Sequence, residues 1–184
     1  MTHDVIVFIA ALGVAGQAIV VLGVLLGLIS FDRLRAWLWG YELWAGFVVA
    51  AVATGGSLFF SQVANFVPCE LCWFQRICMY PLSLLLLFLA FHGDNRAARY
   101  LIPFPLVGGA ISVYHLLVEN KVVGQASACL VSAPGGCATK WINEFGYMTI
   151  PTLALTGFVL LIGFLVLAVA GADDTATLPA DAER

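Results

Sequence analysis

Residues 149–171 read TIPTLALTGFVLLIGFLVLAVAG, an apolar stretch without a charged side chain. A helix needs about 20 such residues to cross the hydrocarbon core of a membrane. Four more apolar stretches of similar character precede this one, at residues 5–30, 43–66, 74–92 and 100–118. The sequence therefore predicts an all-α membrane protein with five transmembrane helices.

Composition agrees with a chain that is surrounded mostly by lipid. Of its 184 residues, 62% are hydrophobic and 10% are charged, which is far more apolar than a soluble domain of this size. The net charge of −3 and the lack of a Lys/Arg cluster exclude a nucleic-acid-binding surface. The first apolar stretch is too long for the core of a signal peptide and follows no Lys or Arg, so we expect it in the mature protein.

The loops between these stretches predict the orientation of the chain. Arginines lie in the loops after the first and third stretches, namely Arg33, Arg35, Arg96 and Arg99. Short cytoplasmic loops collect Lys and Arg, and an even number of crossings separates these two loops. We therefore expect a multi-pass membrane protein with a cytoplasmic C-terminus. The N-terminus, the connection at 67–73 and the loop at 119–148 are then extracytoplasmic.

A C-x-x-C motif, Pro68-Cys69-Glu70-Leu71-Cys72, lies in the first of those extracytoplasmic segments, where the next helix begins. The positive end of a helix dipole stabilises a thiolate and lowers the pKa of a thiol. The motif therefore favours thiol–disulfide exchange. Two alternatives are a structural disulfide and half of a zinc site that Cys129 and Cys137 complete, but we expect no metal.

Cys129 and Cys137 form a second candidate pair in the loop at 119–148. The residues between them include Pro134-Gly135-Gly136, which favours a turn, and a turn brings two Cα atoms to the roughly 5.5 Å of a disulfide. A static loop disulfide is the alternative, but two dithiols on one side of a membrane can pass electrons by exchange. The fifth cysteine, Cys78, lies about 240° around the helix from Cys72 and is expected in the core.

Two groups of polar residues accompany the cysteines. Arg76 follows Cys72 by one helical turn, and an arginine at membrane depth marks a functional site or snorkels to the headgroups. Such a guanidinium is suited to hold a quinone carbonyl and to stabilise the negative charge that develops on reduction. His115 and Glu119 end the fourth apolar stretch, where they could assist proton uptake by a reduced ring or simply hydrogen-bond within the bundle. We include His115 in the expected quinone site.

Two weaker patterns concern local structure. Trp141, Ile142 and Phe145 would share one side of a short helix along the membrane interface. Gly23 and Gly27 form a G-x-x-x-G pattern, which permits close contact between helices.

Several stretches resemble DsbB-type disulfide bond formation proteins, in particular the short BdbC branch. They are PCELCWFQRI at 68–77, MYP at 79–81, SVYH at 112–115 and GYMTIPTLAL at 146–155. The resemblance implies a DsbB-type four-helix transmembrane bundle over 43–171. Residues 1–42 would add an N-terminal transmembrane helix and a cytoplasmic linker, and residues 172–184 a disordered acidic cytoplasmic tail.

The resemblance also implies an activity. A thiol:quinone oxidoreductase of the bacterial cell membrane would reoxidise a thioredoxin-fold partner of the DsbA/BdbD type and pass electrons to ubiquinone or menaquinone. By position, Cys72 is the cysteine implied to contact the quinone, Cys69 would form a disulfide with it, and Arg76 would bind the quinone. The reduced thioredoxin-fold protein would attack Cys129, and Cys137 would be the resolving cysteine of that pair.

Other functions fit parts of the pattern. A vitamin K epoxide reductase-like enzyme is also a helical bundle with a C-x-x-C, but there the motif usually lies in a later helix. A noncatalytic membrane scaffold with two structural disulfides is the alternative from another class.

Overall fold

The computed structural model describes residues 2–127, 129 and 135–177. Within these residues the regular structure is helical: α1 (Thr2–Leu38), α2 (Glu42–Gln62), α3 (Glu70–His92), η1 (Ala97–Leu101), α4 (Pro103–Glu119), η2 (Gly136–Ala138) and α6 (Ile150–Thr177). Among the described residues, five helical segments are long and apolar enough to cross a membrane. The predicted all-α class and the five spans are confirmed.

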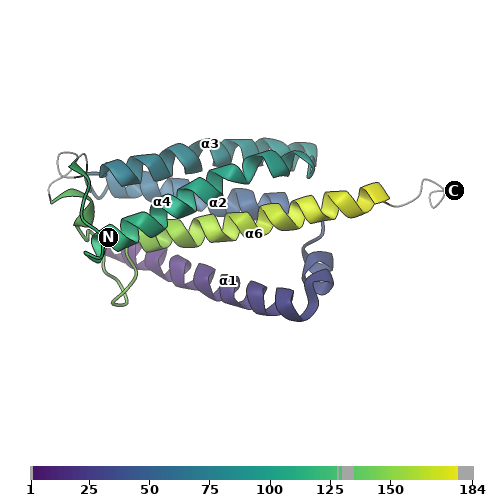
Figure 1. Ribbon diagram of the computed structural model, residues 1–184, viewed down its shortest axis with the longest axis horizontal. Helices are drawn as coiled ribbons and strands as arrows, with labels where there is room; N and C mark the ends of the chain where they lie inside the picture. The colour runs from purple at the N-terminus through teal and green to yellow at the C-terminus, as the bar shows by residue number, and fades with distance from the viewer. Residues whose placement is uncertain (1, 128, 130–134, 178–184) are drawn as a thin grey trace.

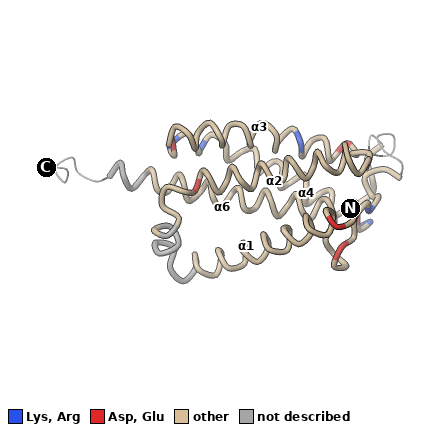
Figure 2. Tube along the Cα trace, turned by 180° about the vertical axis from the view of Figure 1, so that it is seen from behind, with Lys and Arg blue, Asp and Glu red and all other residues tan. Residues whose placement is uncertain are grey.

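The helices α2, α3, α4 and α6 pack side by side as a bundle, and α1 lies along α6 (Figure 1). Charged residues of the described chain lie mostly toward the two ends of the bundle, and few lie in its middle (Figure 2). This distribution fits a hydrocarbon layer around the middle, because a charge there is expensive.

Large apolar side chains from α3 and α6 fill the centre of the bundle. Leu82 and Leu86 of α3 and Phe158 of α6 are fully buried. The α4–α6 contact depends on Gly108, since a Cβ there would lie 2.3 Å from the Phe158 ring. A glycine at this point allows the two backbones to approach closely.

The N-terminal helix contacts α6 through its first half. Gly13 and Gly16 face Leu153 and Thr156, whereas a Cβ on Gly23 or Gly27 would meet no atom within 4 Å. Among the described residues, the Gly23 and Gly27 pattern therefore makes no close helix contact within this chain. Figure 1 shows the reason, because α1 diverges from α6 toward its C-terminal end.

The helix ends differ from the apolar stretches in two places. Helix α1 continues to Leu38, through part of the segment that we expected to be a linker. Helix α6 continues to Thr177, so residues 172–177 of the expected disordered tail are helical. No Gly or Pro interrupts 172–177, and the next proline is Pro179, so no helix-breaking residue ends α6 earlier. The rest of the expected tail, 178–184, lies outside the described residues.

The segment before α6 forms a turn and not the expected interfacial helix. Glu144 and Met148 exchange two backbone hydrogen bonds of 3.1 and 2.9 Å. Phe145 and Gly146 have φ values of 55° and 80°, a left-handed conformation that glycine adopts at no steric cost. The turn at Phe145-Gly146 therefore prevents a helix, although the apolar spacing around it suggested one.

Candidate active site

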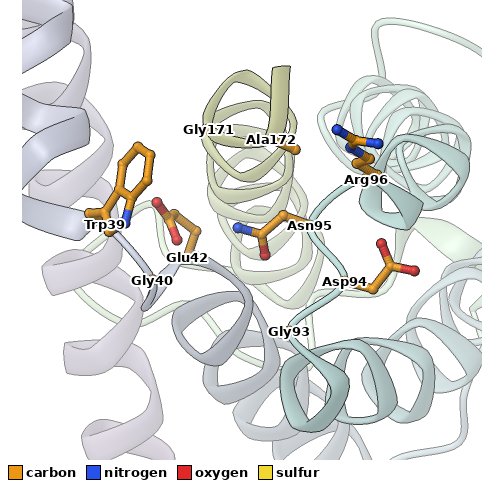
Figure 3. A pocket seen from close by; sticks show the side chains of 9 residues that line it. All are labelled: Trp39, Gly40, Glu42, Gly93, Asp94, Asn95, Arg96, Gly171 and Ala172. Carbon is orange, nitrogen blue, oxygen red and sulfur yellow. The ribbon is translucent and has the colours of Figure 1, made fainter. Parts of the chain in front are cut away.

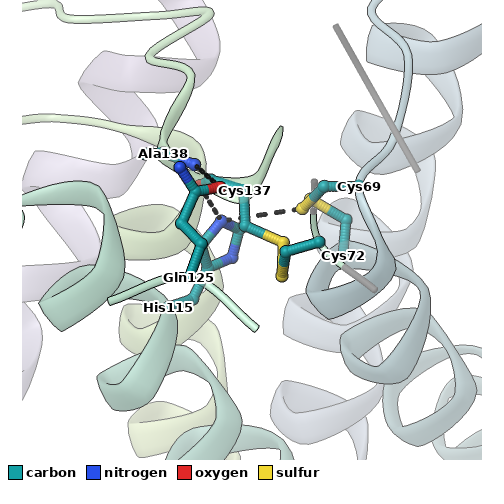
Figure 4. The surroundings of a disulfide bond; sticks show 7 residues. Cys69, Cys72, His115, Gln125, Cys137 and Ala138 are labelled. Atoms are coloured by element: carbon teal, nitrogen blue, oxygen red, sulfur yellow. Dashed lines mark hydrogen bonds between the residues drawn. A yellow bond between two sulfur atoms is a disulfide. The ribbon is translucent and has the colours of Figure 1, made fainter. Parts of the chain in front are cut away.

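The four paired cysteines meet at one end of the bundle, the end at which the N-terminus also lies (Figures 1 and 4). Cys69 is the N-cap residue of α3, and its carbonyl accepts a 3.1 Å hydrogen bond from the Trp73 amide. This local geometry places the Cys69 and Cys72 sulfur atoms 3.1 Å apart. Cys69 is buried and Cys72 is half-buried, so the two thiols of the motif differ in access.

Cys129 and Cys137 form a disulfide, with their Cα atoms 5.3 Å apart. Both are buried, at 2% and 1% exposure. Gly135 and Gly136 lie before Cys137 with φ values of 80° and 72°, and the Gln125 side chain accepts a 3.3 Å hydrogen bond from the Ala138 amide. The loop backbone thus holds Cys137 against the bundle, and the oxidised pair offers no thiolate to a zinc ion.

His115 of α4 connects the two cysteine pairs (Figure 4). Its Nε2 lies 3.7 Å from the Cys69 sulfur and 3.1 Å from the carbonyl oxygen of Cys137. The ring is buried, at 4% exposure, and its Nδ1 has no hydrogen-bond partner among the described residues. The structure therefore places His115 between the two cysteine pairs, and its predicted part in the quinone site stays a prediction.

The surroundings of Cys69 favour its thiolate. Its pKa lies well below the ordinary value, chiefly because the Cys72 side chain hydrogen-bonds to it, and further because of the hydrogen bond and charge of His115. Burial acts in the opposite direction and raises the pKa. Of the two thiols in the motif, Cys69 is therefore the first to ionise.

Arg76 is held by the neighbouring helix α2. Its Nε donates to Ser57 Oγ at 2.9 Å, and its Nη2 donates to the Ser57 carbonyl at 3.1 Å. Tyr80 donates to the same Oγ at 3.2 Å, and the guanidinium lies 5.3 Å from the centre of the Trp73 ring. The sequence analysis did not predict that Ser57 and Tyr80 contact Arg76. The available signal for Ser57 was its hydroxyl group within an apolar stretch.

Buried polar pairs fix α4 against its neighbours. Gln75 donates to Ser112 Oγ at 3.0 Å and so joins α3 to α4. Ser112 lies three residues before His115 on the same helix. Thr149 donates to a carboxylate oxygen of Glu119 at 2.8 Å and so joins α4 to the start of α6. Buried polar networks of this kind specify one arrangement of helices. Glu119 is thus a buried structural partner of Thr149.

The space between the two cysteine pairs is very small. A cavity of about 10 Å³ lies among Cys69, Cys72, His115, Glu119 and Cys137, and a single water molecule would fill it. A quinone ring therefore has no room between the pairs. The open side of α3 differs, because Trp73, Phe74 and Ile77 are exposed there beside half-buried Cys72.

A larger cavity of about 320 Å³ lies at the opposite end of α2 and α3 (Figure 3). Glu42, Asn95 and Arg96 are among its lining residues. Its described lining residues include no cysteine, so the cavity is separate from the two cysteine pairs.

Comparison with known proteins identifies the family of this site. The family described as disulfide bond formation protein DsbB matches residues 35–168. The chain belongs to the DsbB family. Most of α1 lies outside the match, whereas α2, α3, α4 and every cysteine lie within it.

Individual DsbB-family relatives are similar over about two thirds of the chain. Disulfide bond formation protein C of Bacillus subtilis (strain 168) is 47% identical over 127 residues, which are 68% of this chain and 90% of the relative. A probable disulfide formation protein C 1 of Bacillus anthracis is 41% identical over 119 residues, 65% and 85% of the two chains. A probable disulfide formation protein of Deinococcus radiodurans is 37% identical over 133 residues, 67% and 86% of the two chains. No solved structure matches the chain significantly.

Membership of the DsbB family has direct consequences for this molecule. The chain is a disulfide-forming oxidoreductase, and its five apolar helices fit a multi-pass bacterial membrane protein. The match favours the DsbB resemblance over the vitamin K epoxide reductase-like alternative.

Proposed function

We propose that this protein is a dithiol:quinone oxidoreductase that reoxidises an extracytoplasmic thioredoxin-fold protein of the DsbA/BdbD type and reduces a membrane quinone. The observation that carries the proposal is the convergence of two cysteine pairs and His115 at one end of the bundle. The proposal gives the bacterial cell membrane as the location, with the cysteine end extracytoplasmic.

The first step is oxidation of the partner. A thiolate of the reduced partner attacks the Cys129 sulfur, and the Cys129–Cys137 bond breaks. The second thiol of the partner then displaces Cys129, so the partner leaves as a disulfide. Two electrons and two protons remain on Cys129 and Cys137.

The second step moves these electrons to the C-x-x-C pair in its disulfide form. The Cys137 thiolate attacks the Cys69 sulfur and releases Cys72 as a thiolate; Cys129 then displaces Cys69 and restores the Cys129–Cys137 disulfide. His115 lies within contact distance of Cys69 and of the Cys137 carbonyl, so its Nε2 is placed to hold the proton that Cys69 exchanges.

The third step delivers the electrons to lipid. A quinone supplies a two-electron, two-proton acceptor, and the residues on the open side of α3 fit a flat amphipathic ring. Cys72 is the accessible thiol, Trp73 and Ile77 provide apolar surface, and Arg76 provides a fixed cation. Loss of two electrons restores the Cys69–Cys72 disulfide.

Purified protein, a reduced thioredoxin-fold donor and a short-chain quinone test the proposal through the absorbance of the quinone ring. We expect quinone reduction that depends on the donor.

The variant Cys129→Ser should not reduce quinone with the protein donor but should still do so with a small dithiol, which reaches the C-x-x-C pair directly. The variant Cys72→Ser should reduce quinone with neither donor, and Cys78→Ser, the matched control, should behave like the unsubstituted protein. Full activity of Cys72→Ser would contradict the scheme.

A further inference from the structure

Three soft donor atoms meet at the C-x-x-C pair. The Cys69 sulfur, the Cys72 sulfur and a ring nitrogen of His115 all lie within 4.8 Å of one another. Cys69 and His115 are each 4% exposed, and Cys72 is half-buried. Two thiolates and an imidazole form a ligand set that thiophilic cations prefer over harder ions such as Mg²⁺.

The separations between these atoms approach those of a tetrahedral site. Bonds of about 2.3 Å to sulfur and 2.0 Å to nitrogen place two ligands of one zinc ion roughly 3.5–3.8 Å apart. The Cys69 sulfur and His115 Nε2 are 3.7 Å apart, and the two sulfur atoms are 3.1 Å apart. Rotation of the half-buried Cys72 side chain is enough to widen the second distance.

The small volume of the cavity fits an ion better than an organic ligand. The cavity that these three residues share with Glu119 and Cys137 has a volume of about 10 Å³, close to the space of one water molecule. A metal ion is of that size, whereas an organic ligand is much larger. A water molecule is the available candidate for a fourth ligand.

His115 can present Nε2 to an ion once the proton of that nitrogen moves to Nδ1. Nε2 now contacts the Cys137 carbonyl at 3.1 Å, which requires a proton on Nε2. Nδ1 is buried without a hydrogen-bond partner among the described residues, so no contact there opposes transfer of the proton from Nε2 to Nδ1. The Nδ1–H tautomer leaves the Nε2 lone pair facing the sulfur of Cys69.

We propose that the reduced Cys69–Cys72 pair and His115 bind one thiophilic d¹⁰ cation, zinc(II) or copper(I), and that the bound ion holds the protein in its reduced form. Binding replaces two thiol protons by the metal and transfers no electrons. The disulfide form of the pair offers no thiolates and binds nothing. This site differs from the zinc alternative considered for the sequence, because His115 takes the place of Cys129 and Cys137. Metal binding requires only the reduced Cys69–Cys72 pair. That the bound ion also stops electron transfer to quinone rests on the proposed function.

Metal titration of the reduced, purified protein tests the site without any turnover. We expect one zinc(II) per chain by competition with a chromogenic chelator, and none after oxidation of the C-x-x-C pair. Cobalt(II) in place of zinc should give the thiolate-to-metal charge-transfer absorption of a site with sulfur ligands. A parallel titration with copper(I) under a competing chelator decides which ion binds more tightly. Binding of neither ion to the reduced protein would overturn the proposal.

Four variants separate this site from other thiols. The double variant Cys129→Ser/Cys137→Ser should retain one ion per chain, and Cys78→Ser should bind like the unsubstituted protein. His115→Phe should weaken binding at least about tenfold, since removing even an outer-shell partner of a metal has an effect of this size. Cys72→Ser should lose binding. Retained affinity in His115→Phe, or loss in the double variant, would assign the ion to other ligands and overturn the site. Metal binding without any quinone reduction would leave the site intact and contradict only the proposed function.

Discussion

The two thiols of the C-x-x-C motif are not equivalent, and the difference follows from their positions at the helix start. Cys69 caps α3 and is buried against His115, whereas Cys72 lies one turn later and is half-buried. Cys69 therefore lies deeper beside His115, and Cys72 keeps part of its surface exposed. This asymmetry suits a relay that receives electrons on one sulfur and delivers them from the other.

The lowered pKa of Cys69 predicts a shifted pH profile for alkylation. The pKa of Cys69 is lower in the folded protein than in the unfolded chain. The Cys69 thiolate therefore stabilises the fold at pH values above the unfolded pKa, and this stabilisation is lost as the pH falls through the folded pKa. Iodoacetamide should therefore modify Cys69 in the reduced, metal-free protein at pH values below the ordinary thiol pKa of about 8.5. His115→Phe should move the profile to higher pH, as read by mass spectrometry. Identical profiles in both proteins would mean that His115 does not stabilise the thiolate.

Ser57 is predicted to position Arg76 for its ligand. It accepts hydrogen bonds from Arg76 Nε and from Tyr80, and a hydrogen bond to a charged group is worth about 1.5–3 kcal/mol. Ser57→Ala should raise the KM for quinone roughly tenfold with little change in the rate of partner oxidation at saturating quinone. Ser57→Thr keeps the hydroxyl and should restore the KM. A purely structural role would instead lower thermal stability in Ser57→Ala without changing the KM.

At the scale of elements, the contact between α4 and α6 determines where His115 stands. Gly108 lies against Phe158 at a distance that excludes a Cβ, and Gln75 joins the same helix to α3. These contacts bring α4 close enough for His115 to reach both cysteine pairs. The glycine is therefore a requirement of the site as well as of packing.

Two glycine substitutions compare this contact with an open helix position. Gly108→Ala should destabilise the protein by about 1–3 kcal/mol, because the new methyl group overpacks the α4–α6 contact. Gly163→Ala is the matched control, since a Cβ there would meet no atom within 4 Å, and it should be neutral or slightly stabilising. Thermal unfolding in detergent measures both, and equal melting temperatures would show that the bundle adjusts without strain.

The sequence predicted elements better than it predicted their contacts. The run of apolar residues before Gly171 required a helix, whatever that helix packs on, because lipid leaves the backbone no other partners. Packing partners depend on how helices diverge in space, so Gly23 and Gly27 looked like a contact whereas Gly13 and Gly16 form one.

The site shows the same division between local signals and contacts made by folding. The spacing of Cys69 and Cys72 was sufficient to predict a reactive pair, since it is local. The approach of His115 to the Cys137 carbonyl joins residues 22 positions apart, and no local pattern encodes it. Ser57 was missed for the same reason, because its partner lies 19 positions away on another helix.

For the whole molecule, the relay requires that both cysteine segments lie on one side of the membrane. The structure brings them to one end of the bundle, and the arginine count predicts that this end is extracytoplasmic. Val122 and Asp94 report the two ends, because Val122 is 69% exposed after α4 and Asp94 is exposed in the connection between α3 and η1. In intact cells, a cysteine-free background with Val122→Cys should react with a membrane-impermeant maleimide, and Asp94→Cys should react only after lysis. Reaction of Asp94→Cys alone in intact cells would invert the orientation of the molecule and place both cysteine pairs in a reducing compartment, where disulfides do not persist. Such a result would remove the physical basis for partner oxidation outside the cell, because the C-x-x-C pair and the Cys129–Cys137 loop would then face the cytoplasm together.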